Sequence, residues 1–417
     1  MPDASGAPAG APGGNSTAQY TPTGLYSLSS GTVSQANADF AATNDDQSAV
    51  LVSGTANLTL INATITSSGA SKSSDESSFY GLDAGVLAQS GGKVTLTGGA
   101  VTTTGNGANG IFAYGTSTIT ASNVTIKDTG QYAHGAMASG GGTVVLTSVN
   151  ISTAGANSGA IATDRGGGTI TATGGTVTTF GQDSPAIYST GNISVTGGTL
   201  SASGSEAAVI EGANSITLTN SNLSSSKSGK WGVLIYQSMS GDASGTKGTF
   251  TMSGGSLAYT ASSGPLFYVT NSTGVISLKG VTVTNGGGVL IKAATGSWGT
   301  SGSNGGIVVF TADGETLVGD LVSDSSSSIS ATLKDSTALT GSINSAALTL
   351  DASSVWNVTG TSYLTSLSDA SGISGITIAN IHGNGHTVYY DANLAANSAL
   401  GGKTYSLNGG GTLTPKA

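Results

Sequence analysis

The chain has 417 residues, of which 67 are Gly, none is Cys and only 8% are charged, and its formal net charge is -9. An acidic balance disfavours electrostatic capture of nucleic acid or of an anionic membrane surface. The absence of Cys excludes disulfides, thiol catalysis and thiolate metal sites. Hydrophobic residues make up 37% of the chain. They recur as short β-branched runs between turns, which favours a strand-rich fold over disorder.

The N-terminal part of the chain differs from the rest in composition. Residues 1–24 are rich in Ala, Gly, Pro and Ser, and we interpret them as a flexible leader remaining after an export signal. Residues 25–48 are predicted to form an N-terminal cap. No apolar run approaches the roughly 18 residues that a membrane-spanning helix needs, and no segment shows convincing helical periodicity.

A repeat follows the predicted cap. Nine segments of twelve residues align without gaps, as in VTLTGGAVTTTG and ISVTGGTLSASG, and their starts are mostly 23 to 26 residues apart. A period of this length is typical of solenoids. The segments begin at Leu58, Val94, Ile119, Val144, Ile170, Ile193, Ile216, Phe250 and Ile276.

The columns of the alignment predict the backbone. Columns one and three are apolar and column two is nearly all Thr or Ser, as expected of strands whose alternate residues face the core and the solvent. Column five holds only Gly, Asn and Ser, which predicts a left-handed corner, since Gly and Asn tolerate a positive φ. Column eight returns to an apolar residue and starts the next strand.

A third apolar run, such as Ala136–Ala138 or Ala160–Ala162, precedes each block. Three strands per period predict an all-β fold, a single parallel β-helix of roughly a dozen coils, and we infer its right hand from the preference of parallel crossovers. The coils are predicted to be regular over 49–305 and less regular over 306–417. The aromatic residues expected in a C-terminal cap are Trp356, Tyr363, Tyr389, Tyr390 and Tyr405.

The segment SSVWNVTGTSYLTSL at 353–367 resembles the C-terminal passenger region of bacterial autotransporters, and the coils resemble the pectate-lyase-like β-helix superfamily. The resemblance extends over nearly all of the chain after about residue 45. It implies a secreted or cell-surface bacterial protein, adhesin-like or structural, whose partners are surface glycans or proteins. Because polysaccharide lyases and glycoside hydrolases share such folds, an enzyme is the alternative.

We tested the enzyme alternative against the residues. Asp164 and Glu211 follow the same strand two coils apart, so a stacking distance of about 4.8 Å places them roughly 10 Å from each other, near the separation of inverting carboxylates. Arg165 and Tyr188 are expected nearby. The competing interpretation is that all four are turn residues, and the paired Asp and Gly-His-Gly motifs of polygalacturonases are not matched.

The other polar motifs point to no cofactor. His382 and His386 are four residues apart, but the intervening Gly and Asn argue against a helix and no third ligand is nearby, so we predict no metal site. Outward-facing pairs of Thr resemble the flat arrays of ice-binding β-helices, which is a third interpretation, although Thr is also an ordinary strand former. These pairs are Thr95 with Thr97, Thr171 with Thr173, and Thr217 with Thr219.

Insertions interrupt the repeat at about 69–83, 236–249 and 292–305. Insertions in solenoids often carry the binding function. Trp231 and Tyr236 border the second insertion and Trp298 lies in the third. These aromatic residues are candidates for stacking on sugar rings, and the alternative is that they anchor the loops to the core.

Overall fold

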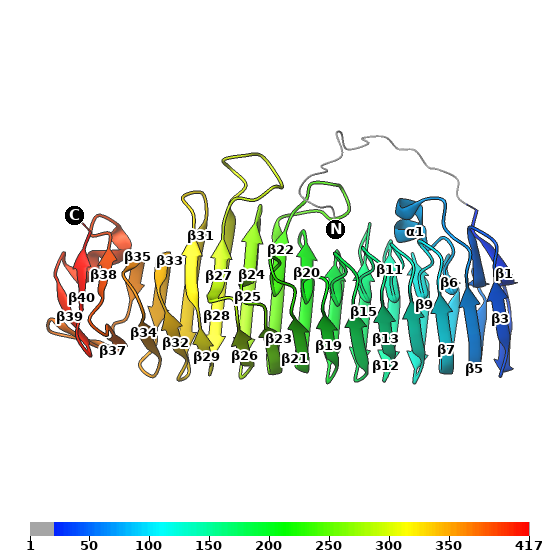
Figure 1. Cartoon of the computed structure of the whole chain (residues 1–417), viewed down its shortest axis with the longest axis horizontal. Helices are drawn as coiled ribbons and strands as arrows, with labels where there is room; N and C mark the ends of the chain where they lie inside the picture. Colours follow the sequence, from blue (N-terminus) through cyan, green and yellow to red (C-terminus); the bar gives the residue numbers. More distant parts are fainter. Residues whose placement is uncertain (1–20, 417) are drawn as a thin grey trace. The chain divides into compact units, whose positions relative to one another are not determined.

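The computed structural model describes residues 21–416. The fold is all-β, with 55% strand and 3% helix, and a sheet of mostly parallel strands, which confirms the predicted class. The described residues fall into two compact units: unit 1 extends to Lys227 and includes 239–245, and unit 2 comprises 228–238 and the residues from Thr246 onward. Figure 1 colours and labels the strands in chain order.

Unit 1 begins with short strands that already pair in parallel. β1 (Thr23–Leu28) pairs with β4 (Gln47–Val52), while β2 (Thr32–Ala36) and β3 (Asp39–Ala42) both pair with β5 (Asn57–Ser67). The region predicted as a cap therefore consists of strands that pair with the following ones. Most of the predicted leader, residues 1–20, lies outside the described part of the chain.

Three sets of parallel strands alternate along unit 1, and each strand pairs with the next member of its own set. The first set is β6 (Val86–Ala88), β8 (Ile111–Tyr114), β11 (Ala136–Ser139), β14 (Ile161–Thr163), β17 (Ile187–Ser189) and β20 (Ala208–Glu211). The second is β7 (Lys93–Thr103), β9 (Thr118–Ser122), β12 (Gly142–Thr147), β15 (Gly168–Thr173), β18 (Asn192–Thr196) and β21 (Ser215–Ser225). The third adds β10 (Thr125–Asp128), β13 (Asn150–Thr153), β16 (Thr176–Thr179) and β19 (Thr199–Ala202) to the ends of β7 and β21.

The pairing register reproduces the sequence alignment. Leu58 is opposite Val94, and Val94 is opposite Ile119. All nine column-one side chains are at most 2% exposed, and burying each aliphatic side chain stabilises the fold by roughly 1.5–3 kcal/mol. The nine column-five residues all have positive φ, from 47° at Asn220 to 68° at Gly197, which confirms the predicted left-handed corner.

The insertion at 69–83 contains a helix that the sequence analysis missed. α1 (Ser74–Tyr80) begins after Ser73, whose side chain accepts a hydrogen bond from the backbone N of Glu76, and it ends at Gly81 with φ 77°. A Ser followed three residues later by Glu is a capping signal. Seven residues are too few for apolar periodicity to be visible, so the lack of helical periodicity in the sequence did not reveal this helix.

α1 packs on an apolar cluster formed by the central residues of the first strand set. Leu87, Phe112 and Met137 are fully buried in this cluster, although strand alternation would direct them away from the coil interior. Gly81 lies against Phe112 and Leu87, and the Ser139 hydroxyl donates to the carbonyl of Phe79. Strands β6, β8 and β11 are therefore buried on both faces.

Unit 2 repeats the parallel pattern. One set of strands is β22 (Val233–Tyr236), β24 (Pro265–Thr270), β27 (Val289–Ala293), β30 (Asp320–Ser323) and the start of β33 (Ile343–Leu350). A second is β23 (Lys247–Tyr259), β25 (Ser272–Lys279), β28 (Gly306–Asp313), β31 (Ser328–Lys334) and the end of β33. A third contains β26 (Thr282–Asn285), β29 (Thr316–Val318), β32 (Ala338–Gly341), β34 (Val355–Val358) and β37 (Thr377–His382). Parallel strands thus continue beyond residue 306.

The C-terminal strands correct part of the predicted cap. The parallel pairing continues through β35 (Ser362–Ser368), β38 (Thr387–Tyr390) and β40 (Thr412–Pro415). Two strands instead pair antiparallel, β36 (Ile373–Ser374) with β37 and β39 (Tyr405–Asn408) with β40. A 3₁₀ helix, η1, covers Ala395–Leu400. Trp356 lies in β34, which has a parallel neighbour on each side. Its ring is fully buried and donates to the Gly341 carbonyl at 2.9 Å. Trp356 is therefore a core residue.

Candidate functional sites

The four residues singled out for the enzyme alternative lie together in unit 1. Asp164 follows β14, Tyr188 lies in β17 and Glu211 ends β20, and β17 pairs with both of the other strands. The Tyr188 hydroxyl donates to Glu211 Oε2 at 2.6 Å. Arg165 directly follows Asp164. We call Asp164, Arg165, Tyr188, Glu211 and Asp242 the acidic cluster.

Burial controls the chemistry of Asp164. Its side chain is 9% exposed, and Oδ1 accepts a hydrogen bond from the backbone N of Arg165 at 2.7 Å. Burial raises the pKa of Asp164 well above its usual value, and the negative charges of Asp242 and Glu211 raise it further. Asp164 therefore retains its proton to a higher pH than a solvated Asp.

Arg165 joins two insertions of unit 1. Its guanidinium lies 3.8 Å from the ring centroid of Phe79 in α1 and forms an ion pair with Asp242 at 3.0 Å. The carbonyl of Ser244 accepts a hydrogen bond from the backbone N of Ala213 at 2.8 Å, which holds the segment 239–245 against the turn after Glu211. Asp242 was not identified from the sequence, since a lone Asp in a Gly- and Ser-rich insertion carries no pattern.

The packing limits what the acidic cluster can do. Glu211 is 1% exposed. Glycoside hydrolysis requires two carboxyl groups that flank the scissile bond, and Asp164 and Glu211 are both too enclosed to reach a polymer in this conformation. The arrangement is a buried polar network next to the more exposed ion pair of Arg165 with Asp242.

The rings of His134 and His382 form hydrogen bonds within the fold. His134 Nδ1 is 3.2 Å from the Gly159 carbonyl oxygen, and burial lowers the pKa of His134 to about 4, so the ring is neutral near pH 7. His382 Nδ1 is 2.9 Å from the side-chain oxygen of Asn357. Among residues 21–416, no group of three or more His, Asp or Glu side chains has the arrangement of a metal site.

Two aromatic pairs in unit 2 include the three predicted binding residues. The ring of Trp231 stacks on Tyr268, with centroids 4.7 Å apart and an interplanar angle of 29°. The rings of Tyr236 and Trp298 are 4.6 Å apart and tilted by 52°. Tyr268 was not identified from the sequence, because it lies within the apolar run of β24. We call these four residues the aromatic patch.

The aromatic patch is partly open to solvent and has cations at its edge. Both Trp side chains are half-buried, whereas Tyr236, whose ring contacts Trp298, is 1% exposed. The ammonium groups of Lys230 and Lys292 lie 5.9 and 5.8 Å from the ring centroids of Trp231 and Tyr268. These distances are within the range of cation–π attraction.

The loop that carries Trp298 is held by the side-chain amide of Asn304. Its Nδ2 donates to the carbonyls of Gly296 and Trp298, each at 2.7 Å. Asn304 is itself 2% exposed. The Trp298 ring is therefore positioned by a buried amide as well as by Tyr236, which combines the predicted loop anchoring with a partly exposed surface.

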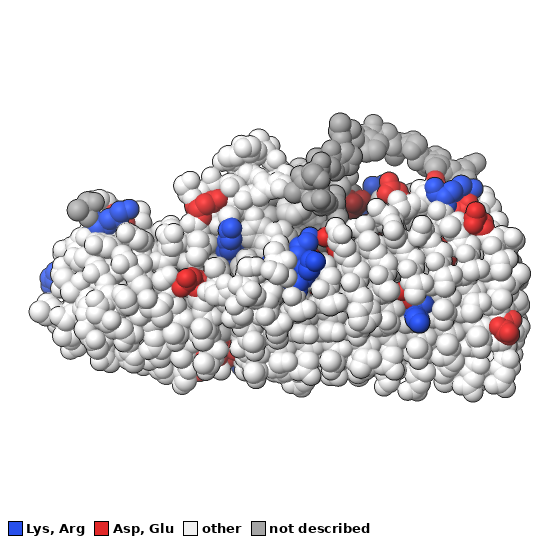
Figure 2. Space-filling model, viewed as in Figure 1, with Lys and Arg blue, Asp and Glu red and all other residues white. Residues whose placement is uncertain are grey.

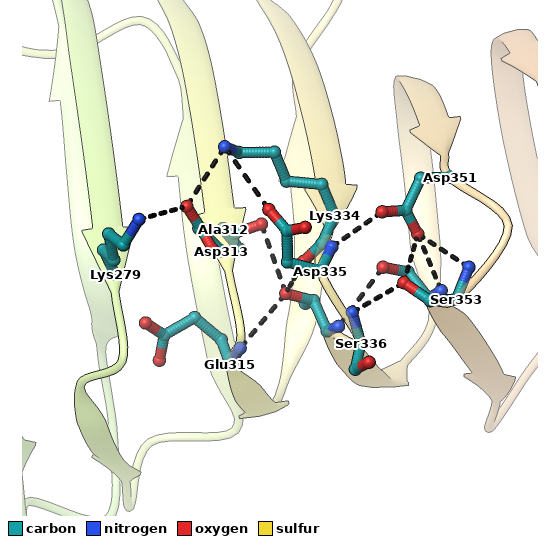
Figure 3. Close-up of polar contacts among 11 residues, drawn as sticks. Lys279, Ala312, Asp313, Glu315, Lys334, Asp335, Ser336, Asp351 and Ser353 are labelled. Atoms are coloured by element: carbon teal, nitrogen blue, oxygen red, sulfur yellow. Dashed lines mark hydrogen bonds and ion pairs between the residues drawn. The ribbon is translucent and has the colours of Figure 1, made fainter.

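Unit 2 contains a charged region of its own, formed by Lys and Asp side chains on neighbouring strands. In Figure 3 the Asp313 carboxylate lies between Lys279 and Lys334, at 3.2 and 3.1 Å. The hydrogen bond from Lys334 lowers the pKa of Asp313. The neighbouring Asp351 carboxylate accepts hydrogen bonds from the backbone N of Asp335 and from Ser353. The carboxylates of Asp313 and Asp351 therefore join successive turns of the chain.

Comparison of the chain with protein-family models, curated proteins and solved structures gives no match. Within the described residues, no helix has the length and apolar character needed to cross a membrane. Figure 2 shows that charged side chains are sparse on the viewed face, which is made mostly of other residues. The functional interpretation therefore depends on the geometry of the sites.

Proposed function

We propose that this chain is a right-handed parallel β-helix with three strands per coil and roughly a dozen coils, and that it acts as an adhesin-like, glycan-binding protein on the outside of a bacterial cell. The alternation of three parallel strand sets supports the β-helix. Its hand follows from the right-handed preference of parallel crossovers, and its extracellular location follows from the resemblance to pectate-lyase-like and autotransporter passenger coils.

The aromatic patch is the observation that carries the binding role. Trp231 and Trp298 each present a partly exposed ring that is fixed by a second aromatic residue. The carbon-bound hydrogens of a sugar pack against such rings, and Lys230 and Lys292 can donate hydrogen bonds to its hydroxyl oxygens. A surface that is already ordered pays less conformational entropy on binding.

Glycan binding is tested with the purified full chain on an array of surface glycans, followed by calorimetry on the ligands that bind. Trp231→Ala and Trp298→Ala are expected to weaken binding at least tenfold. Phe180→Ala is the matched control, since Phe180 is an aromatic residue that is 55% exposed in unit 1. Equal affinities for all four proteins would contradict a binding role for the aromatic patch.

Polysaccharide cleavage is the second candidate, favoured by the gathering of Asp164, Arg165, Tyr188 and Glu211 in one cluster. Release of reducing ends or unsaturated products from acidic and neutral polysaccharides would support it if Asp164→Asn and Glu211→Gln abolished the release. We expect no turnover, because both carboxyl groups are enclosed by the packing of the unit.

A further inference from the structure

A pocket of about 320 Å³ opens on unit 2, away from the residues of the aromatic patch. It lies over β33, β35 and β38 and the turn that follows β38. Its volume is at the lower end of the range for small-molecule sites, about 300–1,000 Å³. Its lining includes Asn344, Tyr363, Thr365, Tyr389, Asp391 and Lys416. We call it the tyrosine pocket.

Two tyrosines stack along one wall of the tyrosine pocket. Tyr363 and Tyr389 are opposite each other in the parallel pairing of β35 with β38, and their rings are 5.3 Å apart with an interplanar angle of 16°. Tyr363 is 39% exposed, whereas the adjacent Leu364 and Tyr390 are 4% and 0% exposed. Strand alternation thus places one tyrosine pair at the surface, where the core does not require it.

Uncharged polar groups and charged groups both surround the two tyrosine rings. Asn344 is opposite Tyr363 in the register of β33 with β35 and is exposed, as is Thr365. The Asp391 carboxylate accepts a hydrogen bond from the backbone N of Asn393 at 2.9 Å, which leaves it at the pocket wall. The Lys416 ammonium lies 5.4 Å from the ring centroid of Tyr363, and the backbone N of Lys416 donates to Tyr390 at 2.8 Å.

This combination selects for a neutral, hydroxyl-rich ligand. An aromatic face accepts the carbon-bound hydrogens of a sugar ring, and amide, hydroxyl, carboxylate and ammonium groups complete its hydrogen bonds. Asp391 would repel a phosphate or a second carboxylate, while the single cation Lys416 is too little charge to hold a polyanion. A purely apolar ligand would leave the polar groups without partners.

We propose that the tyrosine pocket binds a neutral hexose unit of a glycan and is a second subsite, separate in sequence from the aromatic patch. This inference rests on the proposed glycan-binding function. Two weak subsites on one chain bind a long glycan more tightly than either does alone, because the second contact is made at a high effective concentration.

The test uses calorimetry of the full chain with cellohexaose, mannohexaose and a β-galactan oligosaccharide as probes. For the probe that the parent binds, Tyr363→Ala is expected to lower the affinity at least tenfold. Tyr363→Phe keeps the ring, and its affinity is expected to stay within about threefold of the parent's. Circular dichroism checks that each variant is folded. Phe180→Ala is again the exposed-aromatic control.

The outcomes separate the two proposals. If Trp231→Ala weakens binding and folded Tyr363→Ala does not, the pocket inference is wrong and the aromatic patch remains. If Tyr363→Ala alone weakens binding, the pocket stands and the patch does not. Absence of binding of the parent to every probe at millimolar concentration overturns the hexose subsite. Glycan-array binding by the parent would still support the proposed function in that case.

Discussion

Asp83 offers a direct test of how a buried carboxyl shapes the stability of unit 1. The residue follows α1 and is 0% exposed. Oδ1 accepts a hydrogen bond from the Ser67 hydroxyl at 3.1 Å, and Oδ2 has no hydrogen-bond partner among the described residues. Burial is the main cause that raises its pKa from 3.8 to about 7, and the charges of Asp46 and Asp45 add to it.

The sign of the effect follows from linkage between protonation and folding. Because the folded-state pKa lies above the unfolded value, the unfolded chain loses this proton first as the pH rises. The protonated Asp83 carboxyl contributes its full stabilisation of the folded state below about pH 4. This contribution is lost as the pH rises to about 7. At about 1.4 kcal/mol per unit, the shift sets an upper limit of roughly 4 kcal/mol on this loss, since local relaxation lowers the cost of a buried charge.

Asp83→Asn removes the titration and suits the backbone, because Asp83 has φ 62° and Asn tolerates positive φ. The new amide NH₂ lacks a partner and costs about 1–3 kcal/mol at any pH. The difference in unfolding free energy between variant and parent should therefore shift in favour of the variant by about 2–4 kcal/mol from pH 4 to pH 7. Urea unfolding followed by circular dichroism measures it, and a pH-independent difference would refute the reasoning.

Three further predictions use the same described contacts. Trp356→Ala should destabilise unit 2 by about 3–5 kcal/mol in urea unfolding, and a loss below 1 kcal/mol would contradict its core position. Arg165→Ala should speed subtilisin cleavage within 239–245 without lowering the unfolding midpoint by more than a few degrees; an unchanged cleavage rate would mean that the Arg165–Asp242 ion pair does not hold that segment. Ice binding by the outward Thr pairs, such as Thr171 with Thr173, predicts thermal hysteresis that Thr173→Leu reduces, whereas the glycan-binding proposal predicts no hysteresis in the parent.

The repeat could be predicted because its signal is local. Each column-five residue must adopt a positive φ, and Gly or Asn at that position marks the corner whatever the distant packing. The pairing of Val144 with Ile170 then follows from the alignment itself. The outward Thr of column two is exposed at Thr95 and Thr171, as alternation requires.

Contacts within the sites could be predicted where strand stacking alone brings residues together. Tyr188 and Glu211 contact each other because they lie on adjacent strands of one set. Asp242 and Phe79 reach Arg165 from insertions, whose folding depends on tertiary contacts. Trp356 was assigned to a cap because it is large and near the C-terminus, yet its strand has neighbours on both sides.

The first strand set has apolar residues at positions that would face solvent in an uncovered strand. Leu87, Phe112 and Met137 are the middle residues of three such runs, and a strand with a solvated outer face would carry polar residues there. Their burial beneath α1 explains why these runs are continuous. Tyr188, which is opposite Ala162 in this set, also packs against the cluster, and its hydroxyl donates to Glu211. An uninterrupted apolar strand in a solenoid thus indicates that an insertion covers it.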